Sequence, residues 1–179
     1  MAYRDFYIKQ GTIDFVENVE SAASSQGGFY VGSEEWGAYV VELPFGIMPD
    51  LKDLPKTEWY DRSGDDEYVP STPVFKAYEI ETTFAIKGKG TLTDISSKVR
   101  AFVHYLARAG EFAIYNDYSG VGRQKVRYVG YSDSAQYEND GDDAYIEFKV
   151  KLKVNDPITS VVAVKRNGVV IGLGKEGGV

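Results

Sequence analysis

His104 is the only histidine of the 179-residue chain, and the chain contains no cysteine. Histidine suits acid–base catalysis near neutral pH, but it needs a carboxylate or a nucleophile beside it. His104 lies in a stretch of helical spacing, on the face opposite the apolar residues, and no such partner is near it in the sequence. No Ser/His/Asp grouping is indicated either, so the sequence predicts no catalytic residue and no enzyme.

Two acidic clusters are candidates for a calcium site. They are "YDRSGDDEY" (60–68), with Asp61, Asp65, Asp66 and Glu67, and "YENDGDDAY" (137–145), with Glu138, Asp140, Asp142 and Asp143. Calcium takes six to eight oxygen ligands, and neither cluster has the alternate spacing of an EF-hand loop. The second is typical of a polar turn between two strands. We therefore predict no metal site and no cofactor.

Basic residues raise the question of phosphate or nucleic-acid binding. "KGKGTLTD" (87–94) lacks the Gly-Lys-Ser/Thr ending of a phosphate loop, and it is better explained as a connection from a strand to a helix. Lys149, Lys151 and Lys153 lie on one face of a strand, but the chain has 20 basic and 27 acidic residues, a formal charge of −7. Such a charge argues against gripping DNA through its phosphates, and we expect no sequence-specific nucleic-acid binding.

The elements around these residues are mostly strands. "AYEIETTFAIKG" (77–88) and "AYIEFKVKLKV" (144–154) alternate apolar and charged residues, so each has one buried and one solvated face. The glutamates of the first would complement the lysines of the second if the two strands were neighbours. "EFAIYND" and "RQKVRYVGYS" form a predicted hairpin in which Gly120 and Gly122 supply permissive backbone. A C-terminal hairpin is predicted at about 160–174, with Asn167-Gly168 in a type I′ turn.

One stretch is predicted to be helical, "DISSKVRAFVHYLARAG", with a helix over 94–109. Asp94 is the expected N-cap and Gly110 the expected C′ residue. The apolar stripe, which we expect to pack on the sheet, consists of Ile95, Val99, Phe102, Val103 and Leu106. The predicted fold is mainly β (α+β), an antiparallel β-sandwich or partly open barrel with one packed helix, in a single domain spanning 1–179. The pattern indicates no closure of the sheet within one chain.

A proline-rich segment at about 44–75 interrupts the strands. It holds five of the six prolines and shows no sustained period, yet it is rich in apolar residues. Long loops of this kind are usually functional or disordered, and disordered segments carry fewer such residues. We interpret it as an arm that becomes ordered against a partner; the alternative is a loop folded over its own sheet. The expected interface residues are Phe45, Met48, Leu51, Leu54, Trp59, Tyr60 and Tyr68.

The order of these features resembles the tail-tube fold of long-tailed bacteriophages, especially distal tail proteins. The resemblance is in "LPKTEWYDRSGDDEYVP", the strand "FKAYEIETTFAIKG", the helix, the strands "EFAIYND" and "KVRYVGYS", and the ending Val154-Asn155-Asp156-Pro157. It covers about 40–160. It implies a hexameric ring in which sheets of adjacent subunits form a barrel around a channel, with the helix outside. After Pro157 only one hairpin remains, whereas distal tail proteins usually carry a second domain.

These observations predict a structural virion protein of a phage or prophage tail, part of the tail tube or the distal tail and baseplate. Its partners are copies of itself and other tail or baseplate proteins. The N-terminus "MAYRDFYIKQ" is not a signal peptide, and no apolar stretch is long enough to cross a membrane. We therefore expect synthesis in the bacterial host cytoplasm and a place in the virion tail. The alternative is a monomeric β-sandwich module that binds carbohydrate or peptide, since the 14 tyrosines offer stacking surfaces.

Overall fold

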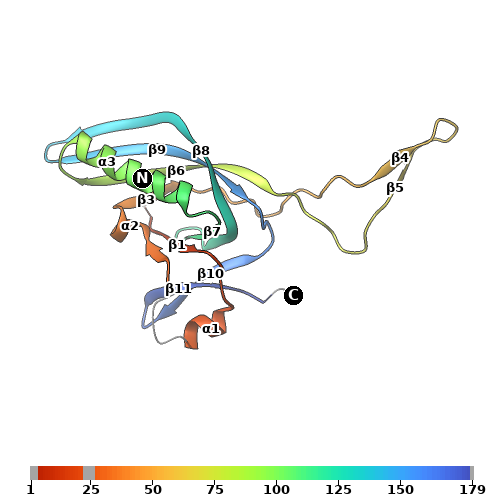
Figure 1. Cartoon of the computed structure of the whole chain (residues 1–179), viewed down its shortest axis with the longest axis horizontal. Helices are drawn as coiled ribbons and strands as arrows, with labels where there is room; N and C mark the ends of the chain where they lie inside the picture. The colour runs from red at the N-terminus through yellow and green to blue at the C-terminus, as the bar shows by residue number, and fades with distance from the viewer. Residues whose placement is uncertain (1–3, 22–26, 178–179) are drawn as a thin grey trace.

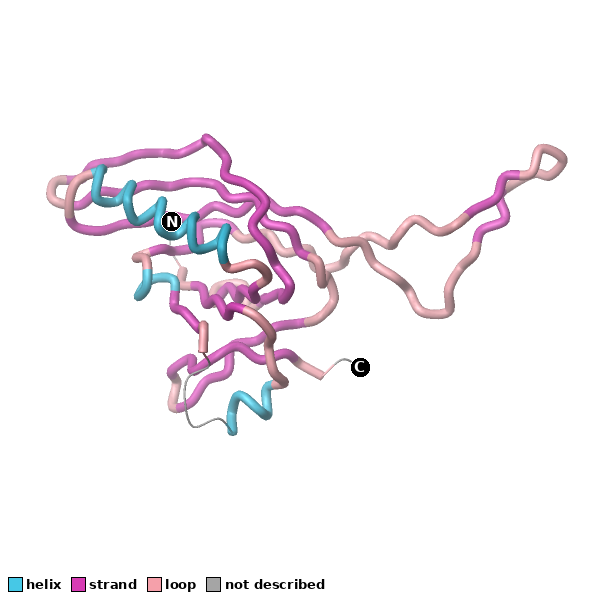
Figure 2. Tube along the Cα trace, viewed as in Figure 1, coloured by secondary structure: helices cyan, strands magenta, loops and turns pink. Residues whose placement is uncertain are grey.

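A computed structural model describes residues 4–21 and 27–177 (Figure 1). Strands are the most abundant element, as Figure 2 shows, and every pairing between named strands is antiparallel. The prediction of a mainly β, antiparallel fold with a packed helix is confirmed. The strands are β1 Phe6–Gln10, β2 Phe29–Val31, β3 Ala38–Glu42, β4 Lys56–Glu58, β5 Asp65–Glu67, β6 Tyr78–Lys89, β7 Phe112–Asn116, β8 Val121–Asp140, β9 Asp143–Val154, β10 Ser160–Arg166 and β11 Val169–Lys175.

The main sheet has the strand order β2-β1-β7-β8-β9-β6-β3, and the β10–β11 hairpin joins it through β8. The two ends of this order meet. Arg4, just before β1, exchanges two backbone hydrogen bonds with Val40 of β3, at 2.9 and 3.4 Å. The expectation of no closure within one chain is therefore wrong: a single long-range pair links the ends, so the sheet forms a partly open barrel.

The principal helix is α3, Leu92–Arg108, and its start differs from the prediction. Thr91, not Asp94, is the N-cap. Asp94 is the third helical residue, and the two form a capping box: the Thr91 amide donates to Asp94 Oδ2 at 2.9 Å, and the Asp94 amide donates to Thr91 Oγ1 at 3.3 Å. These bonds lower the pKa of the Asp94 carboxyl, the backbone bond from Thr91 first. Gly110, with φ +68°, follows the Ala109 C-cap as expected.

Two further short helices are present that periodicity does not indicate: α1, Val16–Ser21, and α2, Gly32–Glu35. Both are held by tertiary packing. Val16 of α1 lies so close to β11 that a Cβ on Gly174 would come within 2.9 Å of its Cα atom. Short segments of this kind gain little from intrinsic helix propensity, so their neighbours decide their structure.

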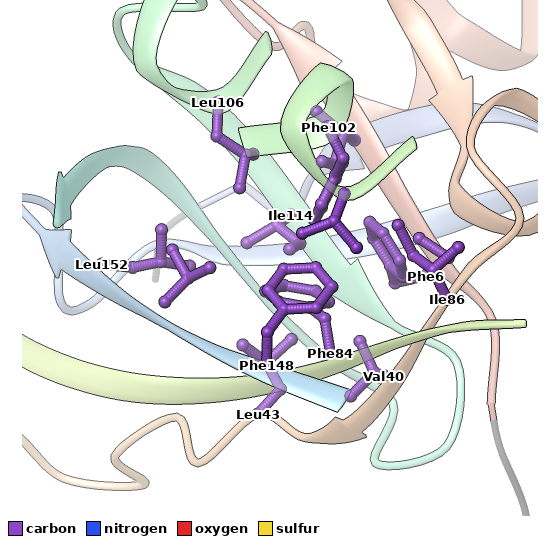
Figure 3. Close-up of a cluster of buried hydrophobic side chains, with 14 of the residues drawn as sticks. Phe6, Val40, Leu43, Phe84, Ile86, Phe102, Leu106, Ile114, Phe148 and Leu152 are labelled. Carbon is purple, nitrogen blue, oxygen red and sulfur yellow. The ribbon is translucent and has the colours of Figure 1, made fainter. Parts of the chain in front are cut away.

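The main core lies between α3 and the inner face of the barrel strands (Figure 3). Ile95, Val99, Phe102 and Leu106 are buried there, and Val103 packs against the same core partly buried. Phe102 is at its centre, with ring centroids 5.1–6.1 Å from its aromatic neighbours. Those neighbours are Phe6, Trp36, Phe84 and Phe148.

A second, smaller core lies under the C-terminal hairpin. The structure places β10 and β11 against β1 and β7, around buried Ile13, Ala113, Val161 and Leu173. The turn residues Asn167 and Gly168 have φ of 51° and 82°, the positive values that a type I′ turn needs.

The predicted β7–β8 hairpin is confirmed, but its two glycines differ in role. Gly120 has φ +68° and makes the turn. Gly122 lies in β8 where β10 packs closely against it. A Cβ at this position would be 2.7 Å from the Val161 carbonyl oxygen, so the close approach requires glycine.

Candidate assembly surface

The proline-rich segment is an extended arm that projects from the domain (Figure 1). Its outgoing and returning segments are hydrogen-bonded to each other near the base. The Lys52 amide donates to the Val74 carbonyl and the Lys76 amide to the Asp50 carbonyl, both at 2.8 Å. Further out, β4 pairs with β5 in register. The arm is therefore a ribbon of two antiparallel segments, and it is not folded over the sheet of its own domain.

The tip of the arm is held by its own polar side chains. Trp59 Nε1 donates to Asp66 Oδ2 at 2.9 Å. Lys56 Nζ lies 3.1 Å from carboxylate oxygens of both Asp65 and Glu58. The hydrogen bond to Asp65 and then that to Glu58 raise the pKa of the Lys56 ammonium. Carboxylates of the first acidic cluster thus fix a hairpin, and in the described parts of the chain no group of three or more metal-ligating side chains is gathered to hold a metal ion.

Most apolar side chains of the arm face solvent. Tyr60 is fully exposed, and Trp59 keeps half of its surface exposed. Among the other expected interface residues, Phe45 packs against the main core at the base of the arm and Leu54 is half-buried. The remaining exposed apolar residues of the arm are Ile47, Met48, Leu51, Tyr68, Val69 and Val74. An apolar surface of this extent is a feature of interaction sites.

Arg123 of β8 fastens the base of the arm to the barrel. The residue is buried, with 7% of its surface exposed, and its Nη2 donates to the Gly46 carbonyl at 3.1 Å while Nη1 donates to the Gly122 carbonyl at 3.1 Å. Its buried Nε has no partner among the residues described. Sequence reasoning missed this contact, because an arginine in an alternating strand is expected to face solvent.

A groove lies between α3 and the outer half of β8. It encloses about 460 Å³, and two basic side chains, Arg100 and His104, stand beside it. His104 is exposed on the polar face of α3, where the sequence places it. The apolar and aromatic residues lining the groove are Val99, Val103, Ala107, Tyr128, Tyr131 and Tyr137.

The outer half of β8 is also a sheet edge. Residues 121–126 pair with β7, but from Arg127 to Asp140 the strand pairs only with β9 within the described residues. An unpaired edge of this length is a template for strand addition by another chain. The partial closure through Arg4 and Val40 leaves this edge free.

The predicted pairing of the glutamate and lysine rows is confirmed. Glu79 lies opposite Lys153 and Glu81 opposite Lys151 in the β6–β9 register. Lys149 Nζ also lies 3.0 Å from Glu81 Oε1, and this hydrogen bond raises the pKa of the Lys149 ammonium. The lysine row is thus matched by carboxylates.

The negative charge of the chain is concentrated on the arm. Residues 44–75 hold seven acidic and three basic residues, a formal charge of −4 out of −7. Helix α3 has the opposite sign, with three basic residues and one acidic residue.

The fold and these surfaces define a mainly β α+β protein with a projecting arm, and none of the helices in the described ranges is long and apolar enough to cross a membrane. Neither models of known protein families nor curated protein sequences give a match. Among solved structures the chain is similar to the crystal structure of SPP1 Dit, described as a paradigm of the hub adsorption apparatus in phages that infect Gram-positive bacteria. The TM-score is 0.49 and the identity 15%, over 88% of this chain and 52% of that one. The chain thus spans about half the length of that protein.

Proposed function

We propose that the protein is a structural component of a phage or prophage tail that assembles with copies of itself into rings. The ring is hexameric, as the sequence resemblance implies, and belongs to the tail tube or to the distal tail and baseplate. The protein is made in the host cytoplasm and resides in the virion, where other tail or baseplate proteins are its neighbours. It carries out no reaction.

The exposed apolar side chains of the arm are the main support for the proposal. The two segments of the arm are hydrogen-bonded to each other, yet the side chains of Tyr60 and Met48 are largely exposed to water. Keeping such side chains in water costs roughly 1.5–3 kcal/mol each relative to burial, which favours a partner that covers them. A segment that served only as a connection would be shorter and more polar.

The free edge of β8 supports the same proposal. Backbone groups between Arg127 and Asp140 are available to a strand of an adjacent subunit, which would continue the sheet around the ring. In such a ring α3 covers one face of the sheet, and the face with the matched glutamates and lysines lines the channel. Because carboxylates lie opposite the lysines, this face offers DNA no unopposed basic stripe.

Light scattering after size exclusion, with negative-stain images, tests the proposal. The full chain should form ring-shaped oligomers whose fraction rises with concentration. Replacing Trp59 and Tyr60 with serine should shift the population toward monomer, whereas Tyr118→Ser, which alters an exposed tyrosine outside the arm, should not. A chain that stays monomeric at the highest concentrations, with no rings in the images, would contradict the proposal.

One observation favours the alternative, a monomeric binding module for carbohydrate or peptide. Tyr128, Tyr131 and Tyr137 line the groove beside α3, and aromatic rings are common in ligand sites. A glycan or peptide array probed with the full chain distinguishes the two functions. A defined ligand bound by a monomer supports the module, and ring formation without such a ligand supports the tail protein.

A further inference from the structure

The groove between α3 and β8 has the features of a surface that binds a protruding segment of another protein. Its floor is apolar, and Tyr131 and Tyr137 in its wall are 39% and 59% exposed. Arg100 at its rim has no ion-pair partner among the residues that the structure describes. Partly exposed aromatic side chains beside a cation that has no ion-pair partner suit an occupant that is apolar at its centre and acidic around it.

The tip of the arm has this chemistry. Trp59 and Tyr60 are adjacent aromatic residues, and Tyr60 is fully exposed. Asp61 directly follows Tyr60 and forms no ion pair within the described part of the chain, and Glu67 lies on the facing strand, opposite Lys56. The acidic arm and the basic helix α3 are therefore complementary both in charge and in apolar surface.

The arm of the same molecule points away from this groove. Figure 1 shows the arm leaving the domain where β3 ends and β6 begins, and extending away from α3 and from the β8–β9 turn. The base of the arm is fixed in that direction by the bond between Arg123 and Gly46. A different copy of the chain must therefore supply an arm to fill the groove.

We propose that the arm tip of one copy docks in the α3–β8 groove of the next, with Trp59 and Tyr60 against the groove tyrosines and the arm carboxylates beside Arg100. This inference rests on the proposed self-assembly and adds the receiving surface. The contact joins two different surfaces of the chain, so repeating it produces either a closed ring or an open filament. It also places α3 between the core and a neighbouring subunit.

Site-directed cross-linking tests the contact, because the chain has no cysteine of its own. Two differently tagged full-length copies are mixed, one with Ser63→Cys at the exposed arm tip and the other with Ala107→Cys, and treated with a short bis-maleimide. The matched control pairs Ser63→Cys with Lys165→Cys, an exposed position on the C-terminal hairpin. The proposal predicts that the 63–107 pair gives a cross-linked heterodimer and that the 63–165 pair gives only background.

The outcomes separate this contact from the proposed function. If light scattering detects oligomers but the 63–107 yield equals that of the control, the docking site is wrong and the self-assembly stands. If the protein is monomeric and neither pair is linked, both are wrong. Native mass spectrometry showing a small molecule held in the groove of a monomer would overturn the docking site in favour of a ligand-binding role.

Charge reversal provides a second, independent test. Arg100→Glu should weaken association about tenfold or more, because the new glutamate would repel the carboxylates of the docked arm. Asp61→Arg in the same chain should restore at least part of that loss, whereas Glu176→Arg, on the C-terminal segment, should restore none. Equal association of the wild type and the Arg100→Glu variant would overturn the role of Arg100 in the contact.

Discussion

The replacement of Phe102 by alanine tests how far the fold depends on the packing of α3. The Phe102 side chain is completely buried, and its ring meets the rings of Phe6, Trp36, Phe84 and Phe148 from four different strands and loops. Truncating a buried phenylalanine removes its transfer free energy and leaves a cavity, at a cost of about 3–5 kcal/mol. Domains have a total stability of about 5–15 kcal/mol, so this one change removes a large part of it.

Equilibrium unfolding in urea, followed by circular dichroism, measures the effect. The conservative variant Phe102→Leu should lose less than Phe102→Ala, because it keeps much of the buried volume. His104→Ala, two residues away on the exposed face of α3, should change the free energy of unfolding by no more than about 0.5 kcal/mol. If Phe102→Ala cost no more than His104→Ala, α3 would not be the element on which the barrel is packed.

Three further changes have defined outcomes. Gly32→Ala should lower the melting temperature by an amount equivalent to about 1–3 kcal/mol, because the new Cβ would overlap a carbon of the Phe6 ring. An unchanged or higher melting temperature, the usual effect of this substitution in a helix, would show that the ring moves aside. Burial raises the pKa of Tyr105 from 10.0 to about 12, so its contribution to stability is complete below pH 10 and is lost as the pH rises toward 12. Tyr105→Phe should therefore weaken the alkaline loss of stability seen in thermal melts, and an identical alkaline profile would contradict this assignment. Arg123→Met should speed amide hydrogen exchange in the arm without a comparable change in the barrel, since it removes the donor to Gly46; equal exchange in both proteins would show that the arm does not depend on this bond.

The long elements could be predicted because periodicity dominates them. In β6 and β9 the alternation of apolar and charged residues fixes which face is buried, and the opposite charges of Glu79 and Lys153 indicate the correct partner strand. The apolar stripe of α3 likewise follows from spacing alone. The predicted N-cap of this helix, Asp94, lies three residues too late. Aspartate is a preferred N-cap residue, but it is also suited to the third helical position of a capping box, and the reciprocal bonds with Thr91 show that Asp94 occupies that position.

Features set by single long-range contacts could not be predicted. The closure of the barrel depends on one backbone pair, Arg4 with Val40, which leaves no repeating pattern in the sequence. The burial of Arg123 depends on a carbonyl 77 positions away in the chain. The strands of the arm, β4 and β5, are exposed and polar throughout, so no alternation reveals their pairing.

The candidate surface was predicted unevenly for the same reason. An apolar composition within a proline-rich segment predicts the arm, on which Trp59 and Tyr60 lie exposed; their role at an interface stays a prediction. Composition did not distinguish Phe45, which packs in the core at the base, from the exposed side chains further out. The groove combines α3 with β8, which are separated in the chain by β7, so only the folded chain brings Val103 and Tyr131 together.

Burial of the arm tip by another copy of the chain can be followed through the fluorescence of Trp59. The chain has two tryptophans, so Trp36→Phe, which keeps an aromatic ring against the core, leaves Trp59 as the sole tryptophan. Acrylamide quenching and the emission maximum are recorded over a range of concentrations, with the mass determined in parallel by light scattering. Emission should shift to shorter wavelength and quenching should fall as oligomers form. Oligomers in which Trp59 remains as accessible to acrylamide as it is in the monomer would contradict the burial of the arm tip.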